Sequence, residues 1–340
     1  ASRELAPIRA AQREGATSRR ESETAIAVYK PLIAQEPNDI DLTLALIATE
    51  IDHAHEYATN NKYDIAIPMY REINIRLDAR GEGPETRRLK AISSAYLSNG
   101  LSWDGKQELA EAENEKAVAF ADQLAAAADK DTKVRRTTFE VYSLASSTFE
   151  TIKNDVSLAF AEKALAVAQK AADADPYDTQ AKKDLAKAVS RKGILLTLIG
   201  RTDAGFEQLK ASEQALLELI EREPRNTGYQ DDLGTLYTRF GDAEKLRNDL
   251  TAALAAYRRS ADVFSKLATA DDKNLVAQRD YAQSLKSAGV TEIKLGLRDE
   301  ARITLSKAIE IVESLRQRNA LGKWDQKIFD EMPSLAKLEN

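Results

Sequence analysis

A repeat with a step of 48 residues constrains the fold of this chain more than any other feature. The same residue types recur at equal steps between residues 178 and 319. The recurring sets are Asp178, Asn226 and Asn274; Asp184, Asp232 and Asp280; Gly193, Gly241 and Gly289; and Leu209, Tyr257 and Leu305. Three copies therefore follow one another without an insertion, and each copy is expected to bury its apolar face against the next.

Each copy has the pattern of a helical hairpin. Asp or Asn at the start is a suitable N-cap for a first helix, which runs to a break near Gly200, Asn248 or Gly296. A second helix follows, with small or apolar residues on one face. In the last copy these are Ala301, Leu305, Ala308, Val312 and Leu315. No useful stretch alternates with period two, so the sequence predicts an all-α protein.

The spacing within the second helix resembles a known family. Gly205, Ala253 and Ala301 each precede a bulky residue by four positions and follow a glycine by twelve, and Leu233-Gly234-Thr235-Leu236-Tyr237 is similar to an L-G-x-x-Y run. Both features resemble the tetratricopeptide repeat (TPR), especially the long-repeat arrays of bacterial multidomain proteins. The resemblance implies a right-handed superhelical solenoid of antiparallel hairpins. A standard TPR has about 34 residues, so these helices are expected to be longer.

Weaker copies precede the three regular ones. Ala66, Tyr70 and Ile73 occupy the signature positions of an earlier second helix, and Pro31 and Pro68 predict a kink or a late start in their helices. We expect a single array over residues 1–340. Its approximate repeats are 1–39, 40–83, 84–129, 130–177, 178–225, 226–273 and 274–319, with a capping helix at 320–340.

Composition excludes several classes of partner. The net charge of −6 gives no basic surface for nucleic acid or anionic lipid. Residues 194–199 form the longest apolar stretch, which is too short to enter a membrane as a spanning helix. The absence of cysteine removes disulfides and Cys-ligated metals but leaves the compartment open, with the cytoplasm slightly favoured. Because the chain begins at Ala1 with no leader, we expect an excised domain or a processed protein.

Motifs that carry chemistry are incomplete. Residues 100–106 match the start of a P-loop, but Gln107 stands where Ser or Thr would bind Mg²⁺, so a turn between two helices is expected. His53 and His55 are the only histidines, and they point about 200° apart on a helix, so they are not expected to share a metal. We predict no catalytic residues, no cofactor and no metal, and therefore no enzyme.

The TPR resemblance implies a binding surface on the inner face of the first helices. Carrying the family's inner positions onto the 48-residue step gives Phe139, Tyr142, Ser146, Phe149, Lys187, Ser190, Thr197, Thr235, Thr238, Asp242, Lys245, Gln283 and Lys286. Phe139, Tyr142 and Phe149 share one side of their helix, which admits two interpretations. They are either apolar anchors for a partner or a second stripe packed against a neighbouring helix.

Two functions remain open from the sequence. The first is a scaffold that binds a protein or peptide segment in the concave groove. The second is an intramolecular regulatory or sensor domain that controls a catalytic domain absent from this chain. The Lys and Asn pairs of a carboxylate clamp are missing from the inner positions, so chaperone C-termini are not the expected ligand.

Overall fold

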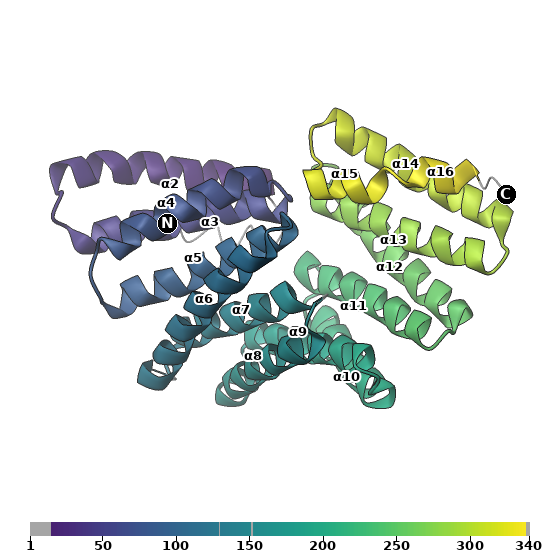
Figure 1. Cartoon of the computed structure of the whole chain (residues 1–340), viewed down its shortest axis with the longest axis horizontal. Coiled ribbons are helices and arrows are strands. Elements are labelled where there is room, and N and C mark those ends of the chain that lie inside the picture. Colours follow the sequence, from purple (N-terminus) through teal and green to yellow (C-terminus); the bar gives the residue numbers. More distant parts are fainter. Residues whose placement is uncertain (1–14, 129, 151, 338–340) are drawn as a thin grey trace. The chain divides into compact units, whose positions relative to one another are not determined.

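The computed structural model describes residues 15–128, 130–150 and 152–337, and every regular element in those residues is an α-helix. The chain divides into two compact units, with the boundary between Ala174 and Asp175. Each unit is described by itself below. The all-α fold class predicted from the sequence is confirmed (Figure 1).

Consecutive helices form antiparallel hairpins in both units (Figure 1). The first unit contains α2 (Gly15–Gln35), α3 (Ile40–Thr59), α4 (Tyr63–Asp78), α5 (Pro84–Trp103), α6 (Gln107–Ala128), α7 (Thr132–Phe149) and α8 (Asn154–Ala174). The second unit contains α9 (Thr179–Leu198), α10 (Thr202–Arg222), α11 (Thr227–Leu246), α12 (Leu250–Ala270), α13 (Leu275–Lys294), α14 (Arg298–Gln317), α15 (Lys323–Phe329) and α16 (Met332–Lys337).

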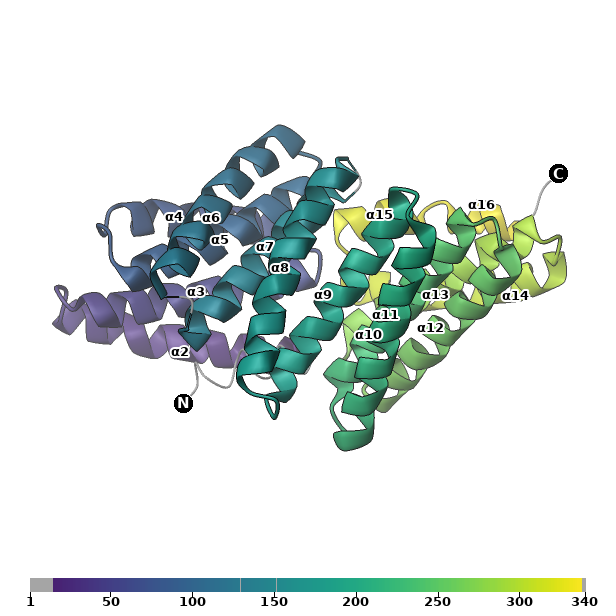
Figure 2. The same cartoon turned by 90° about the horizontal axis from the view of Figure 1, so that it is seen from below.

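The hairpins stack so that first helices lie beside first helices. In the first unit α5 packs against α3 and α7 as well as against α4 and α6, and in the second unit α9 packs against α11 (Figure 2). We call the layer of first helices the inner layer and the layer of second helices the outer layer. The inner layer comprises α3, α5 and α7 in one unit and α9, α11 and α13 in the other.

The predicted N-caps begin the first helices. The Asp178 carboxylate accepts a hydrogen bond from the Ala181 amide at 2.9 Å, and the Asn274 side chain accepts one from the Ala277 amide at 2.9 Å. These bonds satisfy amides that have no partner within their own helix. The first helices of the regular copies start at residues 179, 227 and 275, which reproduces the 48-residue step.

Five of the turns inside the hairpins share one backbone geometry. Asn61, Gly105, Gly200, Asn248 and Gly296 all have positive φ and follow the end of a first helix. The next amide bonds back into the helix, as from Arg201 to the Leu196 carbonyl at 2.8 Å, which is a Schellman motif. Gly105 belongs to the P-loop-like segment, and Lys106 pairs with Asp104 there, so the predicted turn is confirmed.

The second helices supply the core residues that the repeat predicts. Ala301, Leu305, Ala308, Val312 and Leu315 of α14 are all buried. At the C-terminal end, Phe329 and Met332 join the same apolar cluster and cover it. The expected capping segment forms two short helices, α15 and α16, in place of one; Pro333 fits only the first turn of a helix and so favours a new start there.

One half of a local expectation was wrong: the late helix start expected at Pro68 does not occur, and the alternative, a kink, stays a prediction. α4 begins at Tyr63, five residues before Pro68, so the helix does not start late. Pro68 has no amide proton, which leaves the Asp64 carbonyl without its usual helical partner. Pro31 likewise lies inside α2.

Candidate protein-binding surface

Equivalent residues of the first helices form a polar stripe on the inner layer of the second unit. The sixth, ninth and thirteenth residues of each helix lie on one face, because these positions are three and four residues apart. They are Asp184, Asp232 and Asp280; Lys187, Thr235 and Gln283; and Arg191, Arg239 and Ser287. We call these nine residues the inner stripe.

The inner stripe carries opposite charges at its two sides. The sixth position is acidic in all three helices, whereas the thirteenth is arginine in α9 and α11. Seven residues of helix separate the two rows, or about 10 Å. Lys187 is exposed between them, and Thr235 and Gln283 are half-buried. A segment lying across the helices would therefore meet carboxylates on one side and guanidinium groups on the other.

One contact recurs between neighbouring helices of the inner layer. The fifth residue of a first helix is a cation that reaches the following helix in three cases. Arg88 donates to the Thr137 hydroxyl at 3.3 Å, and the Lys183 ammonium lies 3.4 Å from the Asp232 carboxylate. Arg279 lies 3.9 Å from the buried Asp325 carboxylate of α15, so α15 takes the place of a further inner helix.

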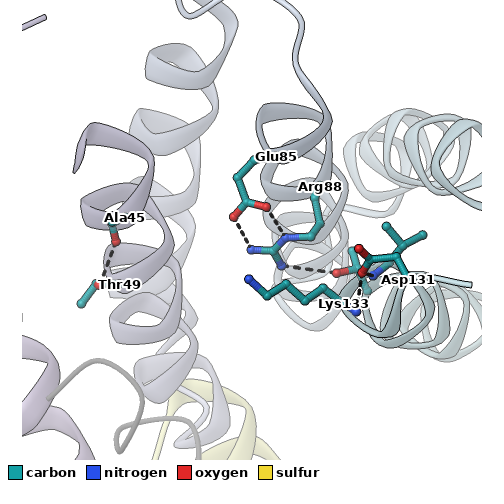
Figure 3. Close-up of polar contacts among 8 residues, drawn as sticks. Ala45, Thr49, Glu85, Arg88, Asp131 and Lys133 are labelled. Atoms are coloured by element: carbon teal, nitrogen blue, oxygen red, sulfur yellow. Dashed lines mark hydrogen bonds and ion pairs between the residues drawn. The ribbon is translucent and has the colours of Figure 1, made fainter. Parts of the chain in front are cut away.

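In the first unit the inner layer is organised around Arg88. Figure 3 shows Glu85 and Arg88 of α5 facing Asp131, the N-cap of α7, and Lys133 in its first turn. Glu85 holds Arg88 through two hydrogen bonds of 2.8 and 2.9 Å. Burial lowers the pKa of Arg88, but the hydrogen bond and charge of Glu85 outweigh burial, and the pKa is raised. The guanidinium is therefore charged and fixed in direction.

Tyr96 forms a second polar centre on α5. Its hydroxyl donates to the Glu140 carboxylate of α7 at 3.1 Å, and its ring stacks on His55 of α3 with 4.0 Å between centroids. Burial and the negative charge of Glu140 raise the pKa of Tyr96, so the hydroxyl stays protonated and keeps donating. Tyr96 thus joins all three inner helices of the first unit.

The four candidates of α7 lie elsewhere than the sequence placed them. Phe139, Tyr142, Ser146 and Phe149 are all buried within the first unit. α7 has 18 residues where α9 has 20, and α7 begins 47 residues before α9. Positions carried from α9 to α7 by a step of 48 residues therefore lie one residue before their true equivalents. Glu140 is the ninth residue of α7 and is the true equivalent of Lys187.

The aromatic residues of α7 fill space that small residues leave in the second helices. The eighth position of a second helix is Leu209, Tyr257 or Leu305 in the regular copies, but Asn114 in α6 and Ala161 in α8. Tyr142 reaches between these two helices. Its hydroxyl donates to Asp122 of α6 at 2.6 Å, and the Lys163 ammonium of α8 lies 5.1 Å from its ring centroid. The structure thus favours the packing interpretation of Phe139, Tyr142 and Phe149 over the anchor interpretation.

The remaining candidates divide between the interior and the surface of the second unit. Ser190 and Thr197 are buried; Ser190 accepts a hydrogen bond from Arg239 at 2.5 Å. Thr238 bonds to the Ser260 hydroxyl at 2.9 Å, in a chain that continues to Ser284. Ser190 and Thr238 thus join helices to one another, whereas the Thr197 hydroxyl donates to the Gly193 carbonyl of its own helix at 3.1 Å.

Two more candidates lie near the C-terminal end of α11, and a third lies near the middle of α13. Asp242 is exposed and accepts a hydrogen bond from the Tyr257 hydroxyl at 2.6 Å, and Lys245 is exposed. Lys286 donates to the Ile328 carbonyl at 2.8 Å and pairs with Glu331, so it holds the C-terminal helices. Of the predicted residues, Lys187, Thr235 and Gln283 are the ones that the inner stripe brings together.

The polar residues of the first unit are absent from the candidates predicted from the sequence. Arg88, Tyr96 and Glu140 were not proposed, because the 48-residue step does not extend to α5 and α7 without change. A signal was present in the sequence, however. Arg88 lies four residues after Pro84, a suitable first helical residue, as Lys183 lies four residues after Thr179.

The described residues hold no cluster suited to a metal. No group of three or more His, Cys, Asp or Glu side chains converges in that part of the chain. His53 hydrogen-bonds Ser22 at 2.9 Å through Nδ1, and His55 stacks on Tyr96. Among the same residues, no helix has both the length and the apolar character needed to cross a membrane.

Comparison with known proteins finds likeness in structure alone. No protein-family model matches the sequence, and no curated protein matches it. Among solved structures, a Rap protein complexed with competence and sporulation factor aligns with a TM-score of 0.55 and 14% identity, covering 98% of this chain and 87% of the other. Aspartyl phosphate phosphatase F from Bacillus subtilis aligns with a TM-score of 0.52 and 14% identity, covering 97% and 79%.

A third similar structure is part of a longer chain. The signal transduction ATPase (STAND) protein with a tetratricopeptide repeat sensor from Pyrococcus horikoshii aligns with a TM-score of 0.50 and 12% identity. The alignment covers 96% of this chain and 44% of that one. These neighbours contain TPR-type repeats, so the TPR-like helical-repeat fold expected from the residues is confirmed. At these identities the likeness shows the fold.

Proposed function

We propose that this chain is a protein-interaction scaffold whose inner layer binds a segment of another polypeptide. The observation that carries the proposal is the inner stripe, in which each first helix of the second unit presents Asp at the sixth position and a polar residue at the ninth. Equivalent residues at equal spacing suit a ligand that crosses several repeats, because such a ligand meets the same chemistry at each step.

Charge on the inner stripe suits a polypeptide better than a nucleic acid. Asp184, Asp232 and Asp280 would repel a phosphate backbone, while Arg191 and Arg239 would attract carboxylates. A partner with basic groups on one side and acidic groups on the other would match both rows. Such complementarity acts mainly on specificity and association rate. In this proposal the chain has no cofactor and is not an enzyme.

The fold likeness supports this class of function without naming the partner. The Rap protein of similar fold is seen in complex with competence and sporulation factor. The Pyrococcus protein carries its repeats as a sensor within a longer signalling ATPase. The second of these observations favours an alternative proposal, in which the inner layer of this chain binds a neighbouring domain of its own polypeptide.

Photo-crosslinking from inside the cell tests the proposal and separates it from the alternative. A benzophenone amino acid replaces Thr235 on the inner stripe of the full-length gene product in its native host. A matched control places the same group at Asp262, which is exposed on α12 in the outer layer. Binding across the inner layer predicts a covalent adduct of one defined larger mass from position 235 and none from position 262.

The outcomes of that experiment distinguish a separate partner, a neighbouring domain of the same polypeptide, and no binding at the inner layer. Binding to a neighbouring domain predicts a crosslink within one polypeptide, with no gain in mass but a new linked peptide after digestion. Equal adducts from both positions, or an adduct from position 262 alone, would contradict use of the inner layer. No adduct and no internal link from position 235 would contradict both proposals.

A further inference from the structure

A groove on the outer layer of the first unit lies between α6 and α8. Its volume is about 410 Å³, and second helices form its walls, whereas the inner stripe lies on first helices of the second unit. Val118 of α6 and Val156 of α8 line its sides, and the rings of Phe149 and Phe160 lie at its wall with 6.0 Å between their centroids. Most of this lining is apolar.

The groove exists because of the small residues in the repeat frame. In α10, α12 and α14 the eighth residue is Leu209, Tyr257 or Leu305, each with 1% or less of its surface exposed. In α6 that residue is Asn114, and in α8 it is Ala161. The aromatic residues of α7 fill part of the missing volume, and the groove is the part that they leave open.

Asn114 is a polar group in a position that the repeat reserves for the core. It is 2% exposed, it lines the groove, and its side chain makes no hydrogen bond with any described residue. Its polar atoms are open to the groove, because neither is among the fully enclosed side-chain atoms that lack a hydrogen-bond partner. The amide is thus positioned for a ligand that can hydrogen-bond it from within the groove.

Acidic residues surround the amide. Glu111, Glu115 and Asp122 line the groove against a single cation, Lys153. Lys153 pairs with Glu111 at 2.7 Å, and its hydrogen bond is the main cause that lowers the pKa of Glu111. Asp122 pairs with Lys163 at 2.9 Å. Glu115 is exposed and pairs with no described residue, so the rim has an uncompensated negative charge beside Asn114.

We propose that this groove binds an arginine side chain from a basic segment of a partner protein. A planar guanidinium can donate to the Asn114 oxygen and to the Glu115 carboxylate together, while its aliphatic stem packs on Val118 and Val156. The Phe149 and Phe160 rings at the wall add apolar surface against which the stem packs. Lysine fits less well, because a strongly hydrated ammonium is costlier to bury beside aromatic rings. This site is distinct from the inner stripe of the proposed function.

Methyl NMR on the whole chain tests this proposal directly. The probe is the tripeptide acetyl-Gly-Arg-Gly-amide, and the readout is the methyl resonances of Val118 and Val156. The matched control probe contains citrulline, which has the shape of arginine without its charge. We expect saturable shifts with the arginine peptide, with a dissociation constant on the order of 1 mM, and no saturable shifts with the citrulline peptide.

Three variants separate the site from its surroundings. Asn114→Leu places in α6 the residue that α10 and α14 carry at the same position, so it should fold and should weaken binding at least about tenfold. Glu115→Gln should weaken binding about threefold. Glu108→Gln removes the same charge from an exposed position of α6 outside the groove and should leave binding unchanged.

Several results would overturn the proposal. Equal shifts with both peptides would show that charge is not recognised. No saturable shift at all would mean that water alone satisfies Asn114. Unchanged binding in Glu115→Gln would exclude this groove as the site even if Asn114→Leu did not fold.

Discussion

Tyr70 and Tyr257 occupy the same place in their repeats but have different surroundings. Each is the eighth residue of a second helix and has at most 1% of its surface exposed. The Tyr257 hydroxyl donates to Asp242 at 2.6 Å. The Tyr70 hydroxyl is buried and has no hydrogen-bond partner among the described residues. The two rings therefore bury similar apolar surface. The Tyr257 hydroxyl stabilises the fold, whereas the Tyr70 hydroxyl destabilises it.

Replacing each tyrosine by phenylalanine measures that difference. Tyr70→Phe removes an unsatisfied buried hydroxyl and should raise the free energy of unfolding by about 1 kcal/mol. Tyr257→Phe removes a hydrogen bond to a carboxylate and should lower it by about 1 kcal/mol. Urea unfolding of the whole chain checks both values, each variant serving as the control for the other. A loss of stability in Tyr70→Phe would show that its hydroxyl has a partner.

Alkaline pH should weaken the fold through the same residues. Burial raises the pKa of Tyr70 and Tyr257, and the nearby Asp242 charge raises that of Tyr257 further. The unfolded state then releases these protons near pH 10 while the folded state retains them. Their contribution to stability is complete below about pH 10 and is lost as pH rises above it.

The measurement is the free energy of unfolding at about pH 8 and about pH 11. Tyr257→Phe should show a smaller decrease between these values than the unchanged chain, because one of the shifted groups is gone. Tyr177 is 88% exposed, so Tyr177→Phe is a matched control and should leave the decrease unchanged. Identical decreases in all three proteins would contradict the expected titration.

At the scale of helices, glycine sets the approach of α9 to α10. A Cβ atom on Gly205 would lie 2.7 Å from the Gly193 carbonyl oxygen, which is a backbone atom and cannot swing away. Gly205→Ala should therefore separate the two helices and cost about 3 kcal/mol of unfolding free energy. Thermal or urea unfolding of the variant measures this loss of unfolding free energy.

Gly296→Ala is the control for that substitution. Gly296 has φ +78 and no atom within 4 Å of a Cβ, so the change costs only backbone strain of about 1–2 kcal/mol. If Gly296→Ala were as damaging as Gly205→Ala, close helix packing would not be the reason for the glycine. Gly205 would then be explained by backbone freedom alone.

The sequence left two roles open for the aromatic residues of α7, and the packing of Tyr142 predicts which role a mutation will reveal. Tyr142 is buried between α6 and α8, so Tyr142→Ala should cost about 3–5 kcal/mol and lower the melting temperature. Any fall in affinity for a partner should then be explained by unfolding. Calorimetry and a binding assay on this variant separate the two roles. Reduced affinity with an unchanged melting temperature would restore Tyr142 as an anchor.

Sequence periodicity predicts the regular repeats well and the irregular ones poorly. The caps Asp178, Asn226 and Asn274 and the core residue Leu305 lie where the 48-residue step places them, because each has a distinctive side chain at a fixed helical position. The register of α7 was missed. Its neighbours α6 and α8 carry alanine at most core positions, and a run of similar small residues does not reveal that the step from α7 to α9 is one residue shorter.

The same reason limits prediction of the candidate site. Lys187, Thr235 and Gln283 were found because their helices follow the regular step. Ser190 and Thr197 were also carried over from the family, but burial cannot be read from type alone for small hydroxyl residues, which satisfy their own helix or a neighbour. Contacts between helices, such as Arg88 with Thr137, join residues 49 positions apart and have no local signal.

At the scale of the whole chain, the repeats make binding a property of several helices together. Within each unit the hairpins pack on their neighbours in sequence, so no single loop holds a complete site. A partner that crosses the inner layer of the second unit would touch α9, α11 and α13, each with a few polar residues. Affinity would then be spread over many modest contacts, and loss of one side chain such as Lys187 would weaken binding only in part.

Hydrogen exchange on the whole chain, with and without the polypeptide crosslinked through position 235, tests this account most directly. Exchange is read for each helix of the second unit. Binding across the inner layer predicts slower exchange in α9, α11 and α13 than in α10 and α12 when the partner is present. Slower exchange confined to α10, α12 or α14, with α9, α11 and α13 unchanged, would contradict the claim that the inner layer is the binding surface.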